Sequence, residues 1–315
     1  MTQNIKQPLG RRDALRCMGW AGTGALFAMH GGVAASTLLE TALAKPVDGG
    51  GGTKGLNFVQ ISDTHIGFNK PANPDPVASL RATIAKIKAL PVAPDFIVHT
   101  GDVTHLATPE QFDTAQQLLG EIGLPVILVP GEHDLVDGAD TRPFNSRFGK
   151  NVQGDGWFSF DAKGVHFVGL VNAVMLGDRG QGTLGRAQID WLKRDLAPLS
   201  ASTPIVLLSH FPLWPLYPDW GWGTADAAEV FDMLRRFGSV TSLNGHIHQI
   251  QRKVEGQLIF HAARSTAYPQ PAPGQGAGPG PLLVPAGQLP AHIGMSSLTV
   301  TTADTPIAIT DQSLA

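Results

Sequence analysis

Short apolar runs alternate with amphipathic stretches along most of the chain, and polar turns separate them. The runs are rich in β-branched and aromatic residues, which is typical of buried strands. The stretches between them repeat apolar residues at helical spacing, as Val77, Leu80, Ile84 and Ile87 do. This alternation predicts helices that cover a parallel or mixed sheet.

The same pattern predicts where the elements lie. Strands are predicted at 56–61, 95–99, 125–129, 157–160, 165–170, 205–208, 240–243, 249–253, 257–261, 296–302 and 307–310. Helices are predicted at 75–90, 110–119, 186–196 and 225–237. We expect the last two strands to lie at a closing sheet edge. Residues 268–290 are dominated by Pro and Gly, which predicts a long ordered loop or a mobile flap rather than a domain.

The first 44 residues have the features of an export signal. Arg11 and Arg12 precede a mostly apolar stretch, and Ala42-Leu43-Ala44 supplies the small residues of a cleavage site. The paired arginines resemble a twin-arginine signal, although Gly precedes them where Ser or Thr is usual. An ordinary secretory signal or a retained membrane anchor is the alternative. We therefore expect a periplasmic or secreted protein that uses the twin-arginine translocation machinery.

The composition of the chain beyond the predicted signal excludes several kinds of site and partner. Cys17 is the only cysteine and lies within the predicted signal, which excludes thiolate ligands, a Cys nucleophile and disulfides from the mature chain. Beyond residue 44 the chain carries 19 basic and 24 acidic residues, a net charge of −5, and no basic stripe. A nucleic-acid-binding surface is therefore not expected. No later apolar run approaches the ~20 residues of a membrane span.

The chain of 315 residues is long enough for one large core. We predict the following organisation: an export signal at 1–44, a Gly-rich linker at 45–55, a main domain at 56–268, and a Pro/Gly-rich loop with C-terminal strands packing on that domain at 269–315.

Five Asp/His clusters follow the apolar runs. They are Asp63-Thr64-His65, Gly101-Asp102, Gly131-Glu132-His133-Asp134, Ser209-His210 and Gly245-His246-Ile247-His248. Carboxylates and neutral imidazoles bind divalent metals, and ligands gather at the carboxyl ends of strands in such sheets. Two metals about 3.5–4 Å apart can clamp the attacking and leaving oxygens of a phosphoryl transfer. The clusters therefore predict a two-metal hydrolase.

Single residues fit roles in that chemistry. Asp102 has the type and position of a bridging carboxylate. His246 and His248 are two residues apart, so one imidazole can serve each metal. His133 follows a Gly turn and can stay free of metal as a donor to the leaving-group oxygen.

The ordered set D-x-H, G-D, G-x-H-D, H and G-H-x-H, from Asp63 to His248, resembles the calcineurin-like metallophosphoesterase superfamily. The residues within and beside these motifs are most similar to those of the class III cyclic nucleotide phosphodiesterase branch. The resemblance implies an α/β fold, a four-layer α/β/β/α sandwich in which mixed sheets are flanked by helices. It also implies an enzyme that hydrolyses a small-molecule phosphoester, with a phosphodiester favoured.

The resemblance further implies a role for each site residue. The first metal would be held by Asp63, His65 and His248, the second by Glu132, His210 and His246, with Asp102 bridging and His133 in the catalytic role. The implied cofactors are two divalent or mixed-valence ions from among Mn, Fe and Zn. A hydroxide that bridges them would attack the phosphorus atom.

Position 132 departs from the family pattern, because Glu stands where the family has Asn. A carboxylate adds a negative charge, so it should bind a hard cation more tightly and make the bound water less acidic. The alternative is that Glu132 turns away. The chain would then be a metal-binding periplasmic protein with degenerate or no catalysis.

Other residues have two interpretations each. His105 lies where purple acid phosphatases carry a metal-binding Tyr, so it is either a ligand of the first metal, or a histidine that supports a ligand or lies in the loop. Asp134 either orients His133 or caps a turn. The segment 214–222 is either an aromatic lid at the site mouth, or a loop core or dimer contact. Candidate phosphate clamps are Arg142, Arg147, Arg179 and Arg264. Beyond the predicted signal, the histidines without a motif are His99, His166, His261 and His292, which we expect in the core or on the surface.

Overall fold

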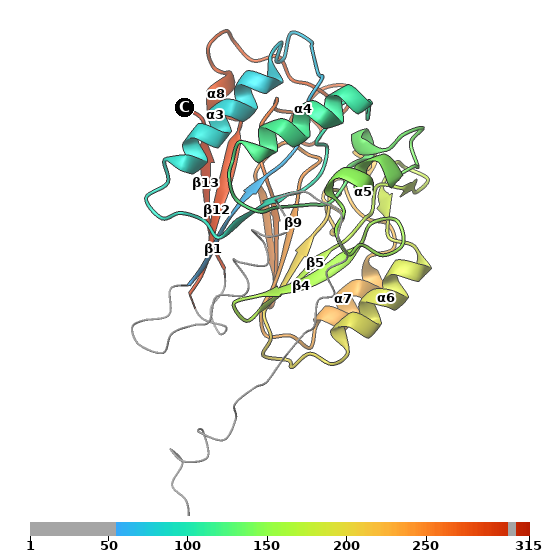
Figure 1. Ribbon diagram of the computed structural model, residues 1–315. Helices are drawn as coiled ribbons and strands as arrows, with labels where there is room; N and C mark the ends of the chain where they lie inside the picture. Colours follow the sequence, from blue (N-terminus) through green and yellow to red (C-terminus); the bar gives the residue numbers. More distant parts are fainter. Residues whose placement is uncertain (1–54, 302–306) are drawn as a thin grey trace, which may run out of the picture. The chain divides into compact units, whose positions relative to one another are not determined.

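The computed structural model describes residues 55–301 and 307–315. The predicted export signal and nearly all of the predicted linker lie outside these ranges. Within them, two mixed β-sheets face each other and helices cover the outer face of each sheet (Figure 1). The expected four-layer α/β/β/α arrangement is confirmed.

The first sheet has five strands in the order β13-β12-β1-β2-β3. Their bounds are Ala308–Ser313, Gly294–Val300, Leu56–Ile61, Phe96–His99 and Val126–Leu128. The last three strands in this order are parallel, whereas β12 is antiparallel to both of its neighbours. The prediction that both C-terminal strands lie at an edge is wrong for β12, which pairs with β1 inside the sheet.

The second sheet has six strands in the order β10-β11-β9-β8-β5-β4. Their bounds are Gln251–Glu255, Leu258–Ala262, Val240–Asn244, Ile205–Leu208, Val165–Gly169 and Phe158–Ala162. The four central strands are parallel, and an antiparallel strand pairs at each edge. Beyond this sheet, β6 (Met175–Leu176) and β7 (Gly182–Thr183) form a short hairpin.

Two helices cover each sheet. Over the first lie α3 (Pro76–Lys88) and α4 (Pro109–Gly120), and over the second lie α6 (Arg186–Leu196) and α7 (Ala228–Leu234). Both α3 and α4 begin as their sequences predict, with a capping side chain followed by Pro. The sequence did not indicate α5 (Arg142–Phe148) or the single turn α8 (Leu289–His292).

A shared core lies between the sheets. Strand residues alternate between the two faces, so Phe58 of β1 points into this layer while Val59 packs under the helices. Phe58 stacks on Phe96 and meets Phe167 of the opposite sheet edge-on, with ring centroids 5.4 Å apart in both pairs. The contact between Phe58 and Phe167 joins the two sheets across the shared core.

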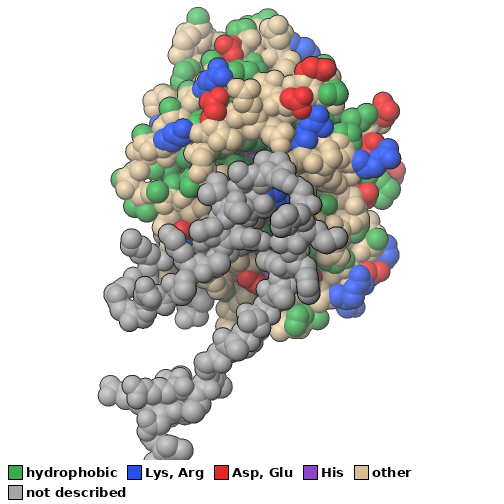
Figure 2. All heavy atoms as spheres, in the orientation of Figure 1, with side chains coloured by type: hydrophobic (Ala, Val, Ile, Leu, Met, Phe, Trp, Pro, Cys, Tyr) green, Lys and Arg blue, Asp and Glu red, His purple; other side chains and the backbone are tan. Residues whose placement is uncertain are grey.

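The described surface carries mixed charge. On the face shown in Figure 2, basic and acidic side chains are interspersed. Among the described helices, none combines the length and apolarity needed to cross a membrane.

Candidate metal centre

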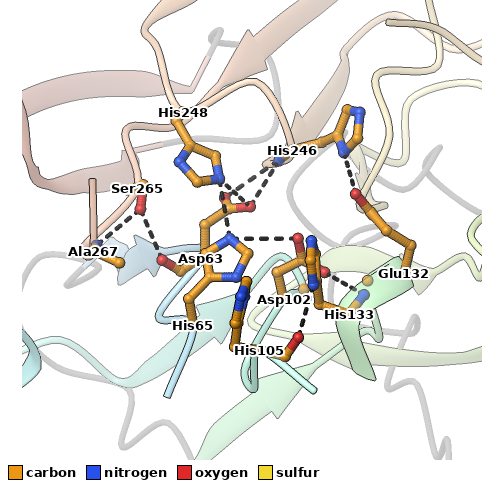
Figure 3. A network of polar contacts seen from close by, with 12 residues as sticks. Asp63, His65, Asp102, His105, Glu132, His133, His246, His248, Ser265 and Ala267 are labelled. Carbon is orange, nitrogen blue, oxygen red and sulfur yellow. Dashed lines mark hydrogen bonds and ion pairs between the residues drawn. The ribbon is translucent and has the colours of Figure 1, made fainter. Parts of the chain in front are cut away.

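The loops that follow β1, β2, β3, β8 and β9 bring the predicted ligands to one place (Figure 3). Three groups that consist only of predicted ligands have ligand atoms that all lie within 4.8 Å of one another: Asp63, His65 and His248; Glu132, His210 and His246; and Asp63, Asp102 and His210. The structure thus brings all seven predicted metal ligands together, in two sets that share the neighbourhood of Asp102.

The first set is fully buried. The Nε2 atoms of His65 and His248 lie 3.2 Å apart, and Asp63 Oδ1 lies 3.2 Å from His248 Nε2. Burial favours the neutral form of Asp63, but His248 and the other polar groups around it hold its pKa below the ordinary value. Two imidazole nitrogens and a carboxylate that converge in this way fit a divalent cation.

In the second set, Glu132 points into the site. Its Oε1 lies 2.9 Å from His246 Nδ1 and its Oε2 lies 2.8 Å from His210 Nε2. Burial favours the neutral acid, yet His246 and His210 hold the pKa of Glu132 well below its usual range. Glu132 Oε2 and His210 Nε2 are buried and close, but they are not aligned as a hydrogen bond, and neither makes a hydrogen bond to any other described residue. Such an orphaned pair fits two ligands aimed at one cation.

Asp102 lies between the sets. Its Oδ2 is 3.6 Å from His65 Nε2 and 3.3 Å from His210 Nε2, and its Oδ1 accepts the backbone N–H of His133 at 2.9 Å. One carboxylate oxygen is therefore within reach of both ligand sets, as the predicted bridging role requires.

Backbone carbonyls orient two of the imidazoles. His210 Nδ1 donates to Thr100 O at 2.7 Å, and His248 Nδ1 donates to Tyr268 O at 2.6 Å. A carbonyl oxygen can only accept, so each Nδ1 carries a proton, and each Nε2 is the ring nitrogen left to face the site. These supports were not predictable from the sequence, because backbone groups leave no residue-type signal.

The site is built on strained backbone. Five of its residues have positive φ angles between 42° and 68°: Asp63, His65, Asp102, His246 and His248. Residues other than Gly adopt this conformation at a cost unless the surroundings impose it. Loop-to-loop hydrogen bonds impose it here, since Asp63 N donates to Gly101 O and His65 N donates to Asp102 O, each at 3.0 Å.

Glycines let the loops approach each other. A Cβ atom at Gly101 would collide with the His210 ring, and one at Gly131 would collide with Asp102. A Cβ at Gly245 would collide with the Asp63 carboxylate. In three of the clusters, the Gly that precedes a predicted ligand is thus required for the loops to pack this closely.

His133 has one ring nitrogen facing the site. Its Nδ1 donates to His105 O at 2.8 Å, which leaves Nε2 available. Burial lowers the pKa of His133, but the carboxylates of Asp102 and Glu132 and the His105 carbonyl together raise it above its ordinary value. The free Nε2 fits the predicted donor role.

Of the two roles considered for Asp134, orienting His133 or capping a turn, the structure shows the capping role. Its carboxylate accepts backbone N–H groups of Gly131, Val103 and Thr104 at 2.8–3.1 Å. It therefore ties the loop after β3 to the loop after β2. Burial and the nearby Asp102 raise the pKa of Asp134 to about 6.

His105 stacks on His133, with ring centroids 4.9 Å apart and an interplanar angle of 17°. Its ligand atom lies within 4.8 Å of those of His65 and His133, a group that contains neither Asp63 nor His248. Burial and the neighbouring His133 and Lys70 lower the pKa of His105 to about 4. The geometry makes His105 the packing partner of the catalytic candidate.

The aromatic segment is a loop core rather than a lid. Trp222 is fully buried and packs against Ile247, the residue between His246 and His248. Trp220 packs edge-on against Trp222, with ring centroids 5.1 Å apart. The segment therefore supports the turn that carries two ligands.

Two of the four candidate arginines are engaged elsewhere, because Arg142 pairs with Asp140 and Arg147 with Asp113. Arg264 lines a pocket that His248 also lines.

The histidines outside the motifs lie in the core or on the surface, as expected. His99, His166 and His261 are buried, and His292 is exposed. Sequence reasoning missed Ser265, whose Oγ donates to Asp63 O at 2.8 Å (Figure 3).

Comparison with known proteins agrees with this geometry. The profile of the calcineurin-like phosphoesterase family matches residues 56–250, which include every predicted ligand and His133. A probable cyclic nucleotide phosphodiesterase of Psychrobacter arcticus is 25% identical over 227 residues, 68% of this chain and 81% of the relative. A probable glycerophosphodiester phosphodiesterase, GpdQ, of Arcobacter nitrofigilis is 22% identical over 219 residues, 67% and 78% of the two chains.

Among solved structures, a dimetal phosphatase from Danio rerio has a similar fold. It aligns with a TM-score of 0.62 at 16% sequence identity, over 82% of this chain and 96% of that one. The family profile covers more than half of the chain and coincides with the residues that build the site. The chain therefore belongs to the calcineurin-like phosphoesterase family and is a metal-dependent phosphoric ester hydrolase.

Proposed function

We propose that the protein hydrolyses phosphodiesters at a dinuclear metal centre. The observation that carries the proposal is the convergence of two ligand sets on the Asp102 carboxylate. Asp63, His65 and His248 would hold one cation, and Glu132, His210 and His246 the other. The cations, when bound, supply Lewis-acid polarisation of the phosphoryl group and neutralise charge that develops in the transition state.

A side chain of the protein, His133, would protonate the leaving oxygen. His133 is held by two contacts, from its backbone N–H to Asp102 and from its Nδ1 to His105 O. These contacts leave Nε2 as the atom that donates a proton to the departing alkoxide. The stacked ring of His105 keeps the imidazole of His133 in this orientation.

Charge supports a diester over a monoester. Three carboxylates, Asp63, Asp102 and Glu132, oppose the charge of two divalent cations, so the centre has a net charge of about +1. A diester monoanion matches this charge better than a monoester dianion does. The names of both relatives, a cyclic nucleotide and a glycerophosphodiester phosphodiesterase, support the same substrate class.

The inward orientation of Glu132 supports a catalytic centre over the metal-binding, non-catalytic alternative. In that alternative Glu132 turns away and weakens the second site. The contacts of Glu132 with His210 and His246 argue that it is a ligand.

The test is hydrolysis of bis(p-nitrophenyl) phosphate by protein loaded with Mn, Zn or Fe. Asp102→Ala and His246→Ala should each abolish turnover. Asp113→Ala, which removes an exposed carboxylate on α4, serves as the control and should leave turnover unchanged. Hydrolysis by Asp102→Ala after metal repletion would contradict the mechanism.

We also propose that the protein acts after twin-arginine export, on the basis of Arg11 and Arg12 ahead of an apolar stretch. Replacing both arginines by Lys should retain the protein in the cytoplasm, as cell fractionation would measure. Unchanged export of that variant would point to an ordinary secretory route.

A further inference from the structure

A pocket of about 260 Å³ adjoins the metal centre. It lies between the turn after β9, the segment after β11, and the residues around α8. Ile250 and Leu282 give it apolar walls, and Arg264 and His292 give it polar ones. The volume corresponds to roughly nine water molecules of about 30 Å³ each, enough for one heterocyclic ring system.

The pocket is built on the metal-binding turn itself. His248, a member of the first ligand set, is one of its lining residues. Gln270, another lining residue, donates from Nε2 to the backbone carbonyl of His246 at 2.9 Å. A molecule whose phosphate lies at the metal centre therefore has this pocket within reach of its organic group.

Most residues that line the pocket lie outside the segment that matches the family profile. The family profile ends at residue 250, whereas Arg264, Gln270, Leu282 and His292 come later in the chain. The segment is held in place, because Gln249 Nε2 donates to the carbonyls of Gln270 and Pro271. Loops added to a common scaffold are where substrate selection usually resides.

The polar groups define what the pocket accepts. Arg264 is partly buried and donates from Nη1 to Ala291 O at 2.8 Å. A guanidinium has five N–H donors and no acceptor, so this bond leaves donors for a ligand. A positive donor beside apolar walls favours a flat group with carbonyl acceptors and disfavours an ammonium group.

We propose that this pocket binds the non-reacting organic group of the phosphodiester, and that it selects a heterocyclic group with carbonyl acceptors, such as a nucleobase. The proposal rests on the phosphodiesterase function proposed above. Arg264 and Leu282 are then specificity residues that do not take part in the bond cleavage.

The test compares two diesters with the same leaving group, thymidine 5′-(p-nitrophenyl phosphate) and methyl p-nitrophenyl phosphate. Leu282→Trp fills the pocket and should raise the KM of the thymidine ester about tenfold while the methyl ester is unaffected. Arg264→Gln should raise the same KM by about tenfold, the effect of one lost charge-assisted hydrogen bond. Leu283→Trp is the matched control, because Leu283 is 66% exposed and outside the lining.

A binding measurement separates this proposal from the proposed function. Calorimetry would compare thymidine 5′-monophosphate with methyl phosphate on the metal-loaded protein. If no diester is hydrolysed, but Leu282→Trp weakens binding of thymidine 5′-monophosphate and not of methyl phosphate, the pocket assignment is supported and the proposed activity is contradicted. If Leu282→Trp and Arg264→Gln change neither the KM of the thymidine ester nor the affinity for the nucleotide, the pocket assignment is overturned.

Discussion

Replacing Glu132 by Asn should shift the enzyme's preference from phosphodiesters towards phosphomonoesters. Glu132 contributes one of the three carboxylates of the centre, and its two oxygens contact His210 and His246. The substitution keeps an oxygen ligand but removes one negative charge. With two divalent cations bound, the net charge of the centre rises from about +1 to about +2.

The size of the shift follows from distance. Ligand atoms of Asp102, Glu132 and His133 lie within 4.8 Å of one another, so a phosphate beside His133 is on the order of 5 Å from the position-132 carboxylate. Two unit charges at about 5 Å interact by roughly 1 kcal/mol in water and about 3 kcal/mol at an effective dielectric of 20. A monoester dianion carries one more charge than a diester, so the ratio of kcat/KM values should change by about 5- to 150-fold.

The assay measures kcat/KM for p-nitrophenyl phosphate and bis(p-nitrophenyl) phosphate at about pH 8, where the monoester is a dianion. Metal content is determined in parallel, so that a lost cation is not mistaken for a charge effect. Glu132→Asp retains the charge and is the control. Equal substrate ratios in Glu132→Asn and Glu132→Asp would refute the charge argument.

Three further predictions concern the supports of the site and the fold. Gly245→Ala should cost metal stoichiometry, because the new Cβ collides with Asp63, whereas Gly120→Ala, which meets open space, should keep its metals; equal metal content by elemental analysis would contradict this. Trp222→Ala should lower the free energy of unfolding in urea by about 3–5 kcal/mol, and a loss below about 1 kcal/mol would show that its burial contributes little. Burial opposes protonation of His166, yet its two carboxylate partners raise its pKa to about 9. Its stabilisation is therefore complete below about pH 6.5 and lost as the pH rises through 9, a change of about 1–2 kcal/mol because one partner is exposed; His166→Gln should remove this pH dependence.

The strand-end motifs were predictable from sequence because each motif follows its own strand. Asp63 and Asp102 lie in the loops that begin at the ends of β1 and β2, and parallel strands deliver such residues to one edge. The orientation of Glu132 was not predictable, since it depends on His210 and His246 from loops that are distant in the sequence.

Long-range contacts also explain the other differences between the predictions from sequence and the structure. Strand β12 lies inside the first sheet because it pairs with β1, which is more than 200 residues earlier. The aromatic run at 214–222 has the composition of an exposed lid. Trp222 is instead buried because Ile247, on another loop, offers an apolar surface to pack against.

The central claim is that two metals on these ligands make a phosphodiesterase, and a metal titration tests it most directly. Metal-free protein would be titrated with Mn²⁺ while hydrolysis of bis(p-nitrophenyl) phosphate and bound metal are followed together. The account predicts that turnover rises to a plateau as the second metal binds, and that Asp102→Ala shows none. Two bound metals per chain without turnover, or full turnover with one, would contradict it.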